Sequence, residues 1–361
     1  MKRKILMTAD TVGGVWTYAL ELSRALAPAG CEVLLATMGA PPSAAQRAEA
    51  AGVANLRVAA SAYKLEWMDD PWADVAAAGE WLLELAAGWE PDIVHLNGYA
   101  HAALPWGAPT LAVAHSCVLS WWRAVHREEA PAGWDTYREK VGAGLRAADL
   151  VVAPTAAMLA ELKHCYGPLP ATAVINNGRD PALAWPAPKQ PLVLAAGRLW
   201  DSAKNLAALD AVAAGLEWPV YIAGCDRHPE GGVARHRHVR ALGVLPFAEL
   251  GAWLGRAAIY ALPARYEPFG LSVLEAAQAG CALVLGDIPS LRELWGDAAL
   301  YVRPDDHAAL RAALERLIGD GHLRAAMAER ARRRSRRWTP ARMAAGYLAA
   351  YDQVARELVI G

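Results

Sequence analysis

The sequence predicts an α/β protein made of two doubly wound parallel-sheet domains in tandem. Short, continuously apolar runs alternate with longer stretches of helical period, which is typical of parallel strands covered by helices on both faces. The chain has 361 residues, enough for two domains of ordinary size. Between the two series of strands, Trp185–Pro191 holds three prolines in seven residues and predicts a stiff linker.

The elements follow in order from these patterns. In the first half the predicted strands are the short apolar runs Ile5–Thr8, Val33–Thr37, Ile93–Leu96, Thr110–Ala114 and Leu150–Ala153. Val15–Ala27 has apolar residues at helical spacing and is predicted to be a helix. After the linker we expect strands at Leu192–Ala196, Val220–Ala223, Ala257–Leu262 and Ala282–Leu285, and helices at Leu206–Ala214 and Ser272–Ala279. The final stretch, Pro340–Leu358, is predicted to be a helix with one apolar face.

Composition excludes several classes of protein. The net charge of −1 argues against a dedicated nucleic-acid binder, whose domain would be strongly basic. The five cysteines are scattered and form no C-x-x-C motif, which favours free thiols in a reducing cytosol over disulfides or a zinc site. The apolar run after Met1 is too short for a signal sequence, and the uncharged stretch Pro105–Trp122 contains prolines and His115. We therefore expect a cytoplasmic protein without stable membrane insertion.

Three loops follow predicted strands, where doubly wound sheets bind their ligands. The first is Asp10–Val15, in which Gly13 and Gly14 let the backbone approach a ligand at the start of a helix. It lacks the G-x-G-x-x-G spacing, and Val33–Thr37 ends without a ribose-binding acidic residue, which argues against a nicotinamide dehydrogenase. A plain tight turn is the alternative interpretation.

The second loop follows Leu192–Ala196 and carries Arg198 and Lys204 ahead of a helix. Two cations beside a helix N-terminus predict a diphosphate clamp. The alternative is a pair of solvated surface cations.

The third loop follows Ala257–Leu262 and reads Glu267-Pro-Phe-Gly-Leu-Ser-Val-Leu-Glu275. Pro268 and Gly270 place Glu267 in an open loop, and Glu275 falls in the first turns of the next helix. Ser272 and Glu275 also have the spacing of a capping box, which would engage Glu275 locally but leaves Glu267 unexplained.

Together these loops carry a family resemblance that covers nearly the whole chain. The E-x7-E pair within E-P-F-G-L-x-x-L-E-A, the Gly197-Arg198-Leu segment with Lys204-Asn205, the Gly13-Gly14-Val15 turn and Asn177-Gly178 are the matching motifs. The chain resembles the retaining nucleotide-sugar glycosyltransferases of the GT-B fold, in particular glycosyltransferase family four, the group 1 glycosyl transferases. The interval between Arg198 and Lys204 is one residue longer than in many relatives.

The resemblance implies a role for each matching residue. Arg198 and Lys204 would bind the donor diphosphate, Glu275 the ribose hydroxyls, and Glu267 the hydroxyls of the transferred sugar. The remaining donor contacts would come mainly from backbone groups of Gly13, Gly14, Gly243, Val244, Phe269, Gly270 and Leu271. His115 would lie near the sugar and the attacking hydroxyl; a histidine hydrogen-bonded beneath a loop is the alternative.

The resemblance also implies an architecture and a reaction. We expect an N-terminal acceptor-binding domain over residues 1–182, a C-terminal donor-binding domain over 183–340, and a terminal helix over 341–361 that returns to the first domain. The expected enzyme is a hexosyltransferase that moves a sugar from a UDP- or GDP-sugar, UDP-glucose among them, to a hydroxyl acceptor with retention. It needs no cofactor, and no D-x-D or other metal site emerges.

Other functions stay open at this point. A GT-B nucleotide-sugar epimerase would turn over the donor without an acceptor, and a phosphorylase would need a pyridoxal-phosphate lysine. A non-catalytic sugar-nucleotide binding protein is the alternative from another class. Trp121-Trp122 could stack on an acceptor or lie in the core. The eight arginines between Arg324 and Arg342 suggest a solvated helix face rather than an anionic partner.

Overall fold

The computed structural model describes residues 2–181, 187–227 and 236–360, with the side chains of 357–360 left out. The chain divides into two compact units. The N-terminal unit holds Met1–Arg123, Glu128–Gly178 and Pro340–Gly361, and the C-terminal unit holds Ala124–Arg127 and Arg179–Thr339. The boundary expected between residues 182 and 183, and part of the linker Trp185–Pro191, lie outside the described residues.

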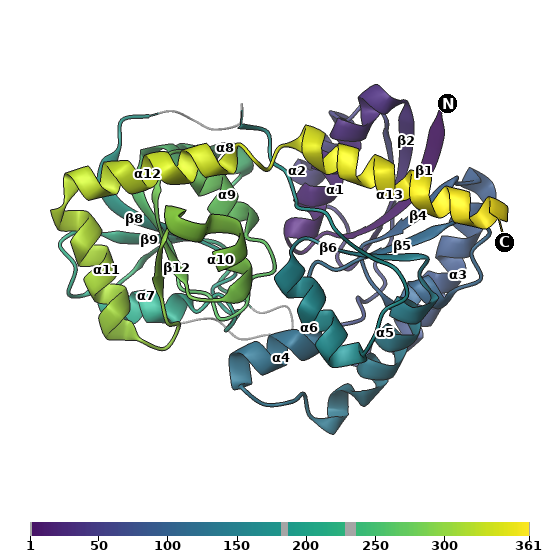
Figure 1. The fold of residues 1–361 in the computed structure, drawn as a ribbon, viewed down its shortest axis with the longest axis horizontal. Coiled ribbons are helices and arrows are strands. Elements are labelled where there is room, and N and C mark those ends of the chain that lie inside the picture. Colours follow the sequence, from purple (N-terminus) through teal and green to yellow (C-terminus); the bar gives the residue numbers. More distant parts are fainter. Residues whose placement is uncertain (1, 182–186, 228–235, 361) are drawn as a thin grey trace. The chain divides into compact units, whose positions relative to one another are not determined.

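The N-terminal unit is built on a seven-stranded parallel sheet in the order β3-β2-β1-β4-β5-β6-β7 (Figure 1). Its strands are β1 (Arg3–Asp10), β2 (Cys31–Met38), β3 (Leu56–Ala60), β4 (Ile93–Leu96), β5 (Thr110–Val113), β6 (Leu150–Ala153) and β7 (Thr172–Val174). The five predicted strands are confirmed. The sequence did not predict the two edge strands β3 and β7, because both are short and largely solvent-accessible and so lack a continuous apolar run.

The helices of this unit connect successive strands. They are α1 (Gly14–Leu26), α2 (Ala44–Ala51), α3 (Trp72–Trp89), the greater part of α4 (Val118–His126), α5 (Asp135–Ala147) and α6 (Ala156–Tyr166), with 3₁₀ turns η1 (Ala27–Ala29), η2 (Ala100–Ala103) and η3 (Ala132–Trp134). The last helix, α13 (Pro340–Ile360), also belongs to this unit and packs against α1. Tyr347 and Tyr351 of α13 are fully buried there beside Tyr18 of α1.

The C-terminal unit contains a six-stranded parallel sheet in the order β10-β9-β8-β11-β12-β13. The strands are β8 (Gln190–Ala196), β9 (Val220–Ala223), β10 (Arg240–Gly243), β11 (Ala257–Leu262), β12 (Ala282–Gly286) and β13 (Leu300–Val302). The helices are α7 (Leu206–Ala213), α8 (Phe247–Arg256), α9 (Leu271–Gln278), α10 (Pro289–Trp295), α11 (His307–Gly319) and α12 (Gly321–Ser335), with a 3₁₀ turn η5 (Gly296–Ala298). All four strands predicted in this half are confirmed.

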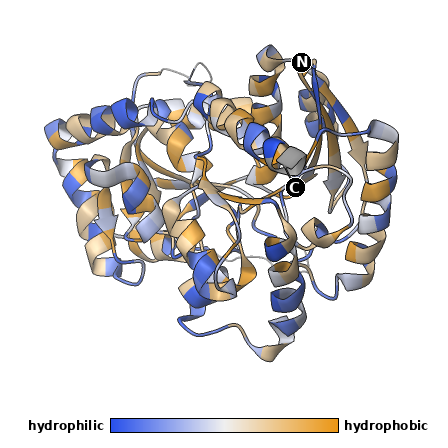
Figure 2. Cartoon of the chain, turned by 45° about the vertical axis from the view of Figure 1, so that its right-hand side comes forward, coloured by the Kyte–Doolittle hydropathy of each residue, from blue (hydrophilic) through white to orange (hydrophobic). Residues whose placement is uncertain are grey.

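Each unit has its own hydrophobic core. The central strands are coloured as mostly hydrophobic, whereas hydrophilic residues gather on the outer faces of the helices (Figure 2). In the C-terminal unit β11 and β12 are buried along their full lengths, as is expected for central strands covered on both faces. Rigid strands therefore support the loops at their carboxyl ends, where the predicted site residues lie.

Candidate functional site

The loops that follow the neighbouring strands β8 and β11 bring two predicted site residues into contact. Lys204 lies in the loop between β8 and α7, and Glu267 in the loop between β11 and α9. The Lys204 ammonium donates to a Glu267 carboxylate oxygen across 2.5 Å. Both side chains are mostly buried, with 18% and 11% of their surface exposed. The loop position predicted for Glu267 is thus confirmed, and Lys204 neutralises its charge.

Backbone and amide hydrogen bonds hold the same two loops together. The Arg265 amide donates to the Ala203 carbonyl over 2.8 Å. The Asn205 side-chain amide donates to the carbonyls of Pro263 and Pro304, and Asn205 itself has a left-handed backbone with φ +55°. The Arg265 guanidinium in turn donates to the side-chain oxygen of Asn205. Such a network fixes the separation of Lys204 and Glu267 before any ligand arrives.

Arg198 is a partly exposed cation at the carboxyl edge of the C-terminal sheet. It follows the end of β8 and donates to Asp201 over 2.7 Å. Its guanidinium lies 4.9 Å from the centroid of the Trp200 ring, and 37% of its side chain is exposed. Asp201 and Trp200 orient Arg198 while leaving part of the guanidinium open to an anion.

Glu275 has a partner that the sequence did not indicate. The Arg179 guanidinium donates to Glu275 over 2.8 Å, and only 4% of the Arg179 side chain is exposed. The capping-box alternative for Glu275 is wrong, because Gly270 occupies the N-cap of α9 and makes no side-chain cap hydrogen bond. The Ser272 hydroxyl instead accepts from Tyr260. Arg179 follows the Asn177-Gly178 motif directly, and that adjacency was the one signal that could have pointed to it.

The start of α9 is shaped by its backbone, and Gly270 at its N-cap is buried. Gly270 has φ +85°, a left-handed conformation that costs glycine little, and it lets α9 begin directly after the loop. Phe269 is buried, with its ring packed edge-on against Trp338 at 6.3 Å. The amides of Leu271 and of the residues that follow are in the first helical turn, whose N–H groups have no partner within the helix. Phe269 can therefore contribute only backbone groups to a ligand.

Glycines lie at the carboxyl ends of the neighbouring strands β9 and β10, with Gly224 just after β9 and Gly243 as the last residue of β10. The Gly224 amide donates to the Gly243 carbonyl over 2.8 Å. Gly224 lies so close to β8 that a Cβ atom there would meet the Gly197 carbonyl oxygen at 1.8 Å, so only glycine fits. Gly243 has φ +70°, and Val244 after it is 73% exposed. An exposed valine beside open backbone suits a flat apolar group.

The order of the strands arranges these features in a line. Gly243 ends β10 and Val244 follows it, Arg198 and Lys204 follow β8, and Glu267 follows β11. Three strand spacings separate β10 from β11, which is about 14 Å. From β10 to β11, the edge thus offers an exposed valine, two cations and a carboxylate beside the start of α9.

The N-terminal unit holds the two remaining predicted glycines and His115. Gly13 is the N-cap of α1, and Gly14 begins the helix. The Asp10 carboxylate accepts from the Val12 and Gly13 amides at 2.9 and 3.1 Å, which shapes the turn. Both glycines are exposed, and a Cβ atom on Gly13 would touch nothing within 4 Å. The backbone of this turn is therefore open to a ligand.

His115 lies just after β5 in a buried network of polar side chains. Its Nε2 atom is 2.8 Å from the Asn97 side-chain oxygen, and its ring packs edge-on against Tyr18. Asn97 also contacts His95, whose Nδ1 atom is 2.7 Å from the Tyr351 hydroxyl of α13. Burial lowers the pKa of His115 to about 3, so its imidazole is neutral at physiological pH. The hydrogen-bonded histidine is thus observed, and a proton acceptor with such a low pKa is a weak base.

Glu66 is a titratable group that the sequence did not single out. Its carboxylate accepts from the backbone amides of Tyr99 and Ala100, at 3.2 and 2.9 Å. Burial raises its pKa to about 7, against the lowering effect of those amide hydrogen bonds. Glu66 sits after the edge strand β3, which the apolar pattern missed, and no motif marks it.

No group of three or more His, Cys, Asp or Glu side chains in the described part of the chain is arranged to hold a metal ion. Among the helices that the structure describes, none combines the length and the apolar character needed to cross a bilayer.

Comparisons with known proteins agree with this architecture. The Glycosyltransferase Family 4 model matches residues 12–183, and the Glycosyl transferases group 1 model matches residues 190–320. A glycogen synthase from Mycobacterium tuberculosis is 30% identical over 350 residues, which cover 86% of this chain and 83% of the relative.

Solved structures share the fold of the whole chain. Sucrose-phosphate synthase from Thermosynechococcus elongatus has a TM-score of 0.83 at 19% identity, and covers 98% of this chain and 99% of its own. Anabaena Alr3699/HepE in complex with UDP-glucose has a TM-score of 0.76 at 17% identity, over 99% of this chain and 100% of its own.

Two Rossmann-like parallel-sheet units with these neighbours define a GT-B glycosyltransferase. The chain belongs to glycosyltransferase family 4, the group 1 glycosyl transferases, and is an enzyme that transfers glycosyl groups.

Proposed function

We propose that the enzyme transfers a hexose from a nucleoside-diphosphate sugar to a hydroxyl acceptor, with retention of anomeric configuration and without a metal ion. The observation that carries this proposal is the carboxyl edge of the C-terminal sheet, where Arg198 and the Lys204–Glu267 pair lie between the apolar surface at Val244 and the start of α9. A nucleobase, a diphosphate and a sugar laid along that edge would meet chemically matched groups.

The two cations would stabilise the leaving diphosphate. Negative charge grows on the diphosphate as the glycosidic bond breaks, and fixed donors aimed at that charge are a major source of rate enhancement. Arg198 is oriented by Asp201, and Lys204 is held by Glu267. The N-terminus of α9 adds a partial positive charge. These groups supply locally the charge that a metal ion supplies in other transferases.

Retention is proposed because, in the part of the chain that the structure describes, the two carboxylates of the donor edge are already paired and His115 is a weak base. An inverting transfer needs a general base on the acceptor hydroxyl. In the C-terminal unit Glu267 is paired with Lys204 and Glu275 with Arg179. His115 in the N-terminal unit has a pKa of about 3. The leaving diphosphate would then take the acceptor proton itself.

The structural neighbour in complex with UDP-glucose makes UDP-glucose the first donor to test, with a GDP-sugar beside it. Glycogen is the first acceptor to test, because the relative from Mycobacterium tuberculosis is a glycogen synthase.

The test is a thermal-shift series over UDP-, GDP- and ADP-sugars, followed by product analysis with the stabilising donor. A donor in excess over its Kd stabilises the fold, by about 2.7 kcal/mol at one hundred times Kd. We expect one nucleotide class to stabilise the wild type and to have little effect on Arg198→Ala. Turnover of the donor without any acceptor would favour the epimerase alternative. Binding without turnover under any acceptor would favour a non-catalytic protein.

A further inference from the structure

The segment between β3 and α3, residues 61–71, crosses the carboxyl edge of the N-terminal sheet. We call it the crossing loop. It starts at the edge strand β3, which β2 and β1 separate from β4. The Gly39 amide after β2 donates to the Tyr63 carbonyl over 2.8 Å, and the side chain of Leu65 lies beside Gly39. Glu66 then reaches the backbone after β4, three strand spacings or about 14 Å from β3.

This crossing puts Glu66 at the point where the strand order of the sheet reverses. From β1 the sheet grows outward through β2 and β3, and the chain then returns to place β4 on the other side of β1. Open parallel sheets bind their ligands at such a switch point, outside the carboxyl ends of the strands. The charged side chains of the proposed donor site belong to the C-terminal unit, so the ligand expected beside Glu66 is the acceptor.

Two backbone amides hold the Glu66 carboxylate and leave it able to accept more hydrogen bonds. The Tyr99 amide donates to it over 3.2 Å and the Ala100 amide over 2.9 Å. An ionised carboxylate offers about four lone-pair sites, so part of its capacity is unused. Glu66 is partly exposed, and among the described residues no cation forms an ion pair with it. The carboxylate is therefore fixed in place and available to the hydroxyl groups of a ligand.

The same edge carries almost no positive charge. In the part of the chain that the structure describes, the segments between each of the strands β1 to β6 and the α-helix or strand that follows it contain one Lys or Arg, which is Lys64. Its ammonium donates to two backbone carbonyls of the crossing loop. Burial lowers the pKa of both His101 and His115, so these imidazoles are neutral at physiological pH. A phosphate group beside Glu66 would meet a like charge without a cation to offset it.

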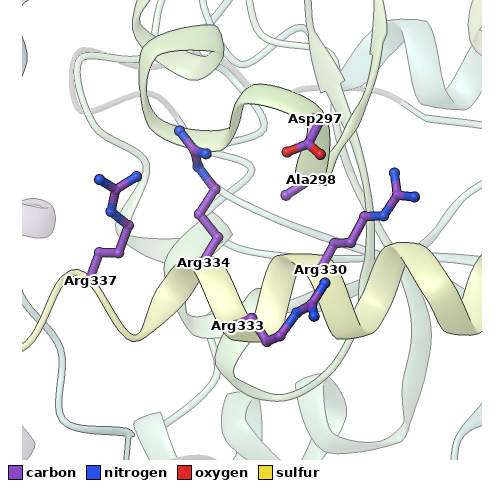
Figure 3. A pocket seen from close by; sticks show the side chains of 6 residues that line it. All are labelled: Asp297, Ala298, Arg330, Arg333, Arg334 and Arg337. Carbon is purple, nitrogen blue, oxygen red and sulfur yellow. The ribbon is translucent and has the colours of Figure 1, made fainter.

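A group of arginines lies on elements of the C-terminal unit instead. Arg330, Arg333 and Arg334 project from α12, and Arg337 from the segment after it, around Asp297 of η5 (Figure 3). The Arg334 guanidinium donates to backbone carbonyls of α10. None of these elements belongs to the N-terminal unit, so their charge does not alter the composition of the edge that carries Glu66.

We propose that Glu66 selects a neutral, polyhydroxyl acceptor and excludes one that carries a phosphate group next to this carboxylate. The inference rests on the proposed function, because it names the acceptor class of that transferase. Hydroxyl groups donate to the unused lone pairs of Glu66, whereas a phosphate is repelled and finds the Tyr99 and Ala100 amides already occupied. Glu66 is thus a specificity-determining residue that acts mainly against the wrong ligand.

The test compares kcat/KM for maltose and for maltose 6′-phosphate, with the donor that the thermal-shift series selects. Assays are run well above the Glu66 pKa of about 7, so that the carboxylate is ionised. The wild type should prefer maltose by about tenfold or more, and Glu66→Ser should lose most of that preference. The matched control is Asp69→Ser, which removes an exposed carboxylate from the same loop and should keep the preference. A wild type that prefers maltose 6′-phosphate, or equal losses in both variants, would overturn the proposal.

Glu66→Gln covers the case in which the serine variant fails to fold. The glutamine oxygen can accept from the same two amides and hold the crossing loop, but it carries no charge. Maltose should remain an acceptor, and the preference over maltose 6′-phosphate should fall by about threefold or more, because the repulsion is gone. A purely structural role of Glu66 would lower the rates with both acceptors and leave their ratio unchanged, which would contradict the proposal.

An NMR titration with inorganic phosphate needs neither donor nor acceptor. In protein labelled with ¹⁵N-tyrosine, phosphate should shift the Tyr99 amide resonance of Glu66→Ser, where the amide is uncovered. It should not shift that resonance in the wild type or in Asp69→Ser. Tyr99→Phe assigns the signal. A shift in the wild type, or none in Glu66→Ser, would overturn the proposal. Absence of transfer to any acceptor, with the expected phosphate shifts, would instead count against the proposed function alone.

Discussion

The Lys204 ammonium and the Glu267 carboxylate, 2.5 Å apart, join the loops that follow β8 and β11. Each is the main counter-charge of the other in a setting with little solvent. Removing one partner leaves the second as an uncompensated, mostly buried charge, which is costlier than removing both. The pair therefore contributes to the stability of the C-terminal unit as well as to its chemistry.

A double-mutant cycle on this pair should show strong coupling. Lys204→Met and Glu267→Gln should each lower the free energy of unfolding by about 2–3 kcal/mol. The double variant should lose clearly less than the sum of the two, because neither charge is then left alone. Urea unfolding of the four proteins gives the coupling energy. Additive losses would show that the two side chains do not depend on each other.

Arg198 offers the complementary case, because 37% of its side chain is exposed and its loss leaves no comparable buried charge. We expect Arg198→Ala to weaken binding of the donor nucleotide by about 1.5–3 kcal/mol, the scale of a charge-assisted hydrogen bond. Its free energy of unfolding should stay close to that of the wild type. Calorimetric titration with the nucleoside diphosphate measures the first, with Arg332→Ala as the control. Wild-type affinity in Arg198→Ala would place the diphosphate elsewhere.

The buried network around His115 predicts a dependence of stability on pH. Burial holds the pKa of His115 at about 3, while the unfolded chain takes up a proton near pH 6.5. The contribution of neutral His115 to the free energy of unfolding is therefore complete above pH 6.5, and it is lost as the pH falls toward 3. At pH 5 this one group should cost about 2 kcal/mol at most.

His115→Gln isolates that effect. The glutamine can keep a hydrogen bond to Asn97 but does not titrate. Unfolding free energies between pH 7.5 and 5 should fall less steeply for the variant than for the wild type. Burial and the nearby His115 lower the pKa of His95 to about 3. His95 should therefore make the free energy of unfolding depend on pH in both proteins. Parallel curves would mean that folding does not lower the pKa of His115.

The apolar pattern predicted the central strands well and the edges poorly. Ile93–Leu96, Leu150–Ala153, Val220–Ala223 and Ala257–Leu262 are found as predicted, because strands buried on both faces need uninterrupted apolar runs. β3 and β10 escaped prediction, since an edge strand keeps polar residues where solvent reaches it. The apolar pattern of the sequence therefore indicates directly which strands are buried, and only indirectly which segments form hydrogen bonds in a sheet.

The sequence likewise predicted part of the candidate site and missed the rest. Sequence motifs located Lys204 and Glu267, and a residue's place after a strand was enough to put them at one edge of the sheet. Their pairing, and the pairing of Glu275 with Arg179 across 96 residues, depend on side-chain packing between distant loops. Glu66 and Asn97 carry no motif at all. Partners set by the fold cannot be deduced from local spacing.

Removal of divalent metal ions should leave the transferase active. Positive charge at the diphosphate is supplied in the proposed function by Arg198, Lys204 and the N-terminus of α9. Initial rates with and without EDTA check this, using the donor that the thermal-shift series selects. Complete loss of activity in EDTA, restored by Mn²⁺ or Mg²⁺, would show that an ion shares the diphosphate with these residues.

The stereochemical outcome is the sharpest prediction. An α-linked donor should give an α-linked product, because Glu267 and Glu275 are engaged by Lys204 and Arg179 and neither is placed as a base for the acceptor. The anomeric proton of the product reports the linkage directly by NMR. A β-linked product would require a general base, for which His115 and Glu66, with its pKa of about 7, would be the candidates.

Glu267→Gln should lower kcat severely while the nucleotide alone still binds, because the proposed contacts of Glu267 are to the sugar that is being transferred. Near-normal turnover in Glu267→Gln would limit this carboxylate to holding Lys204 in place.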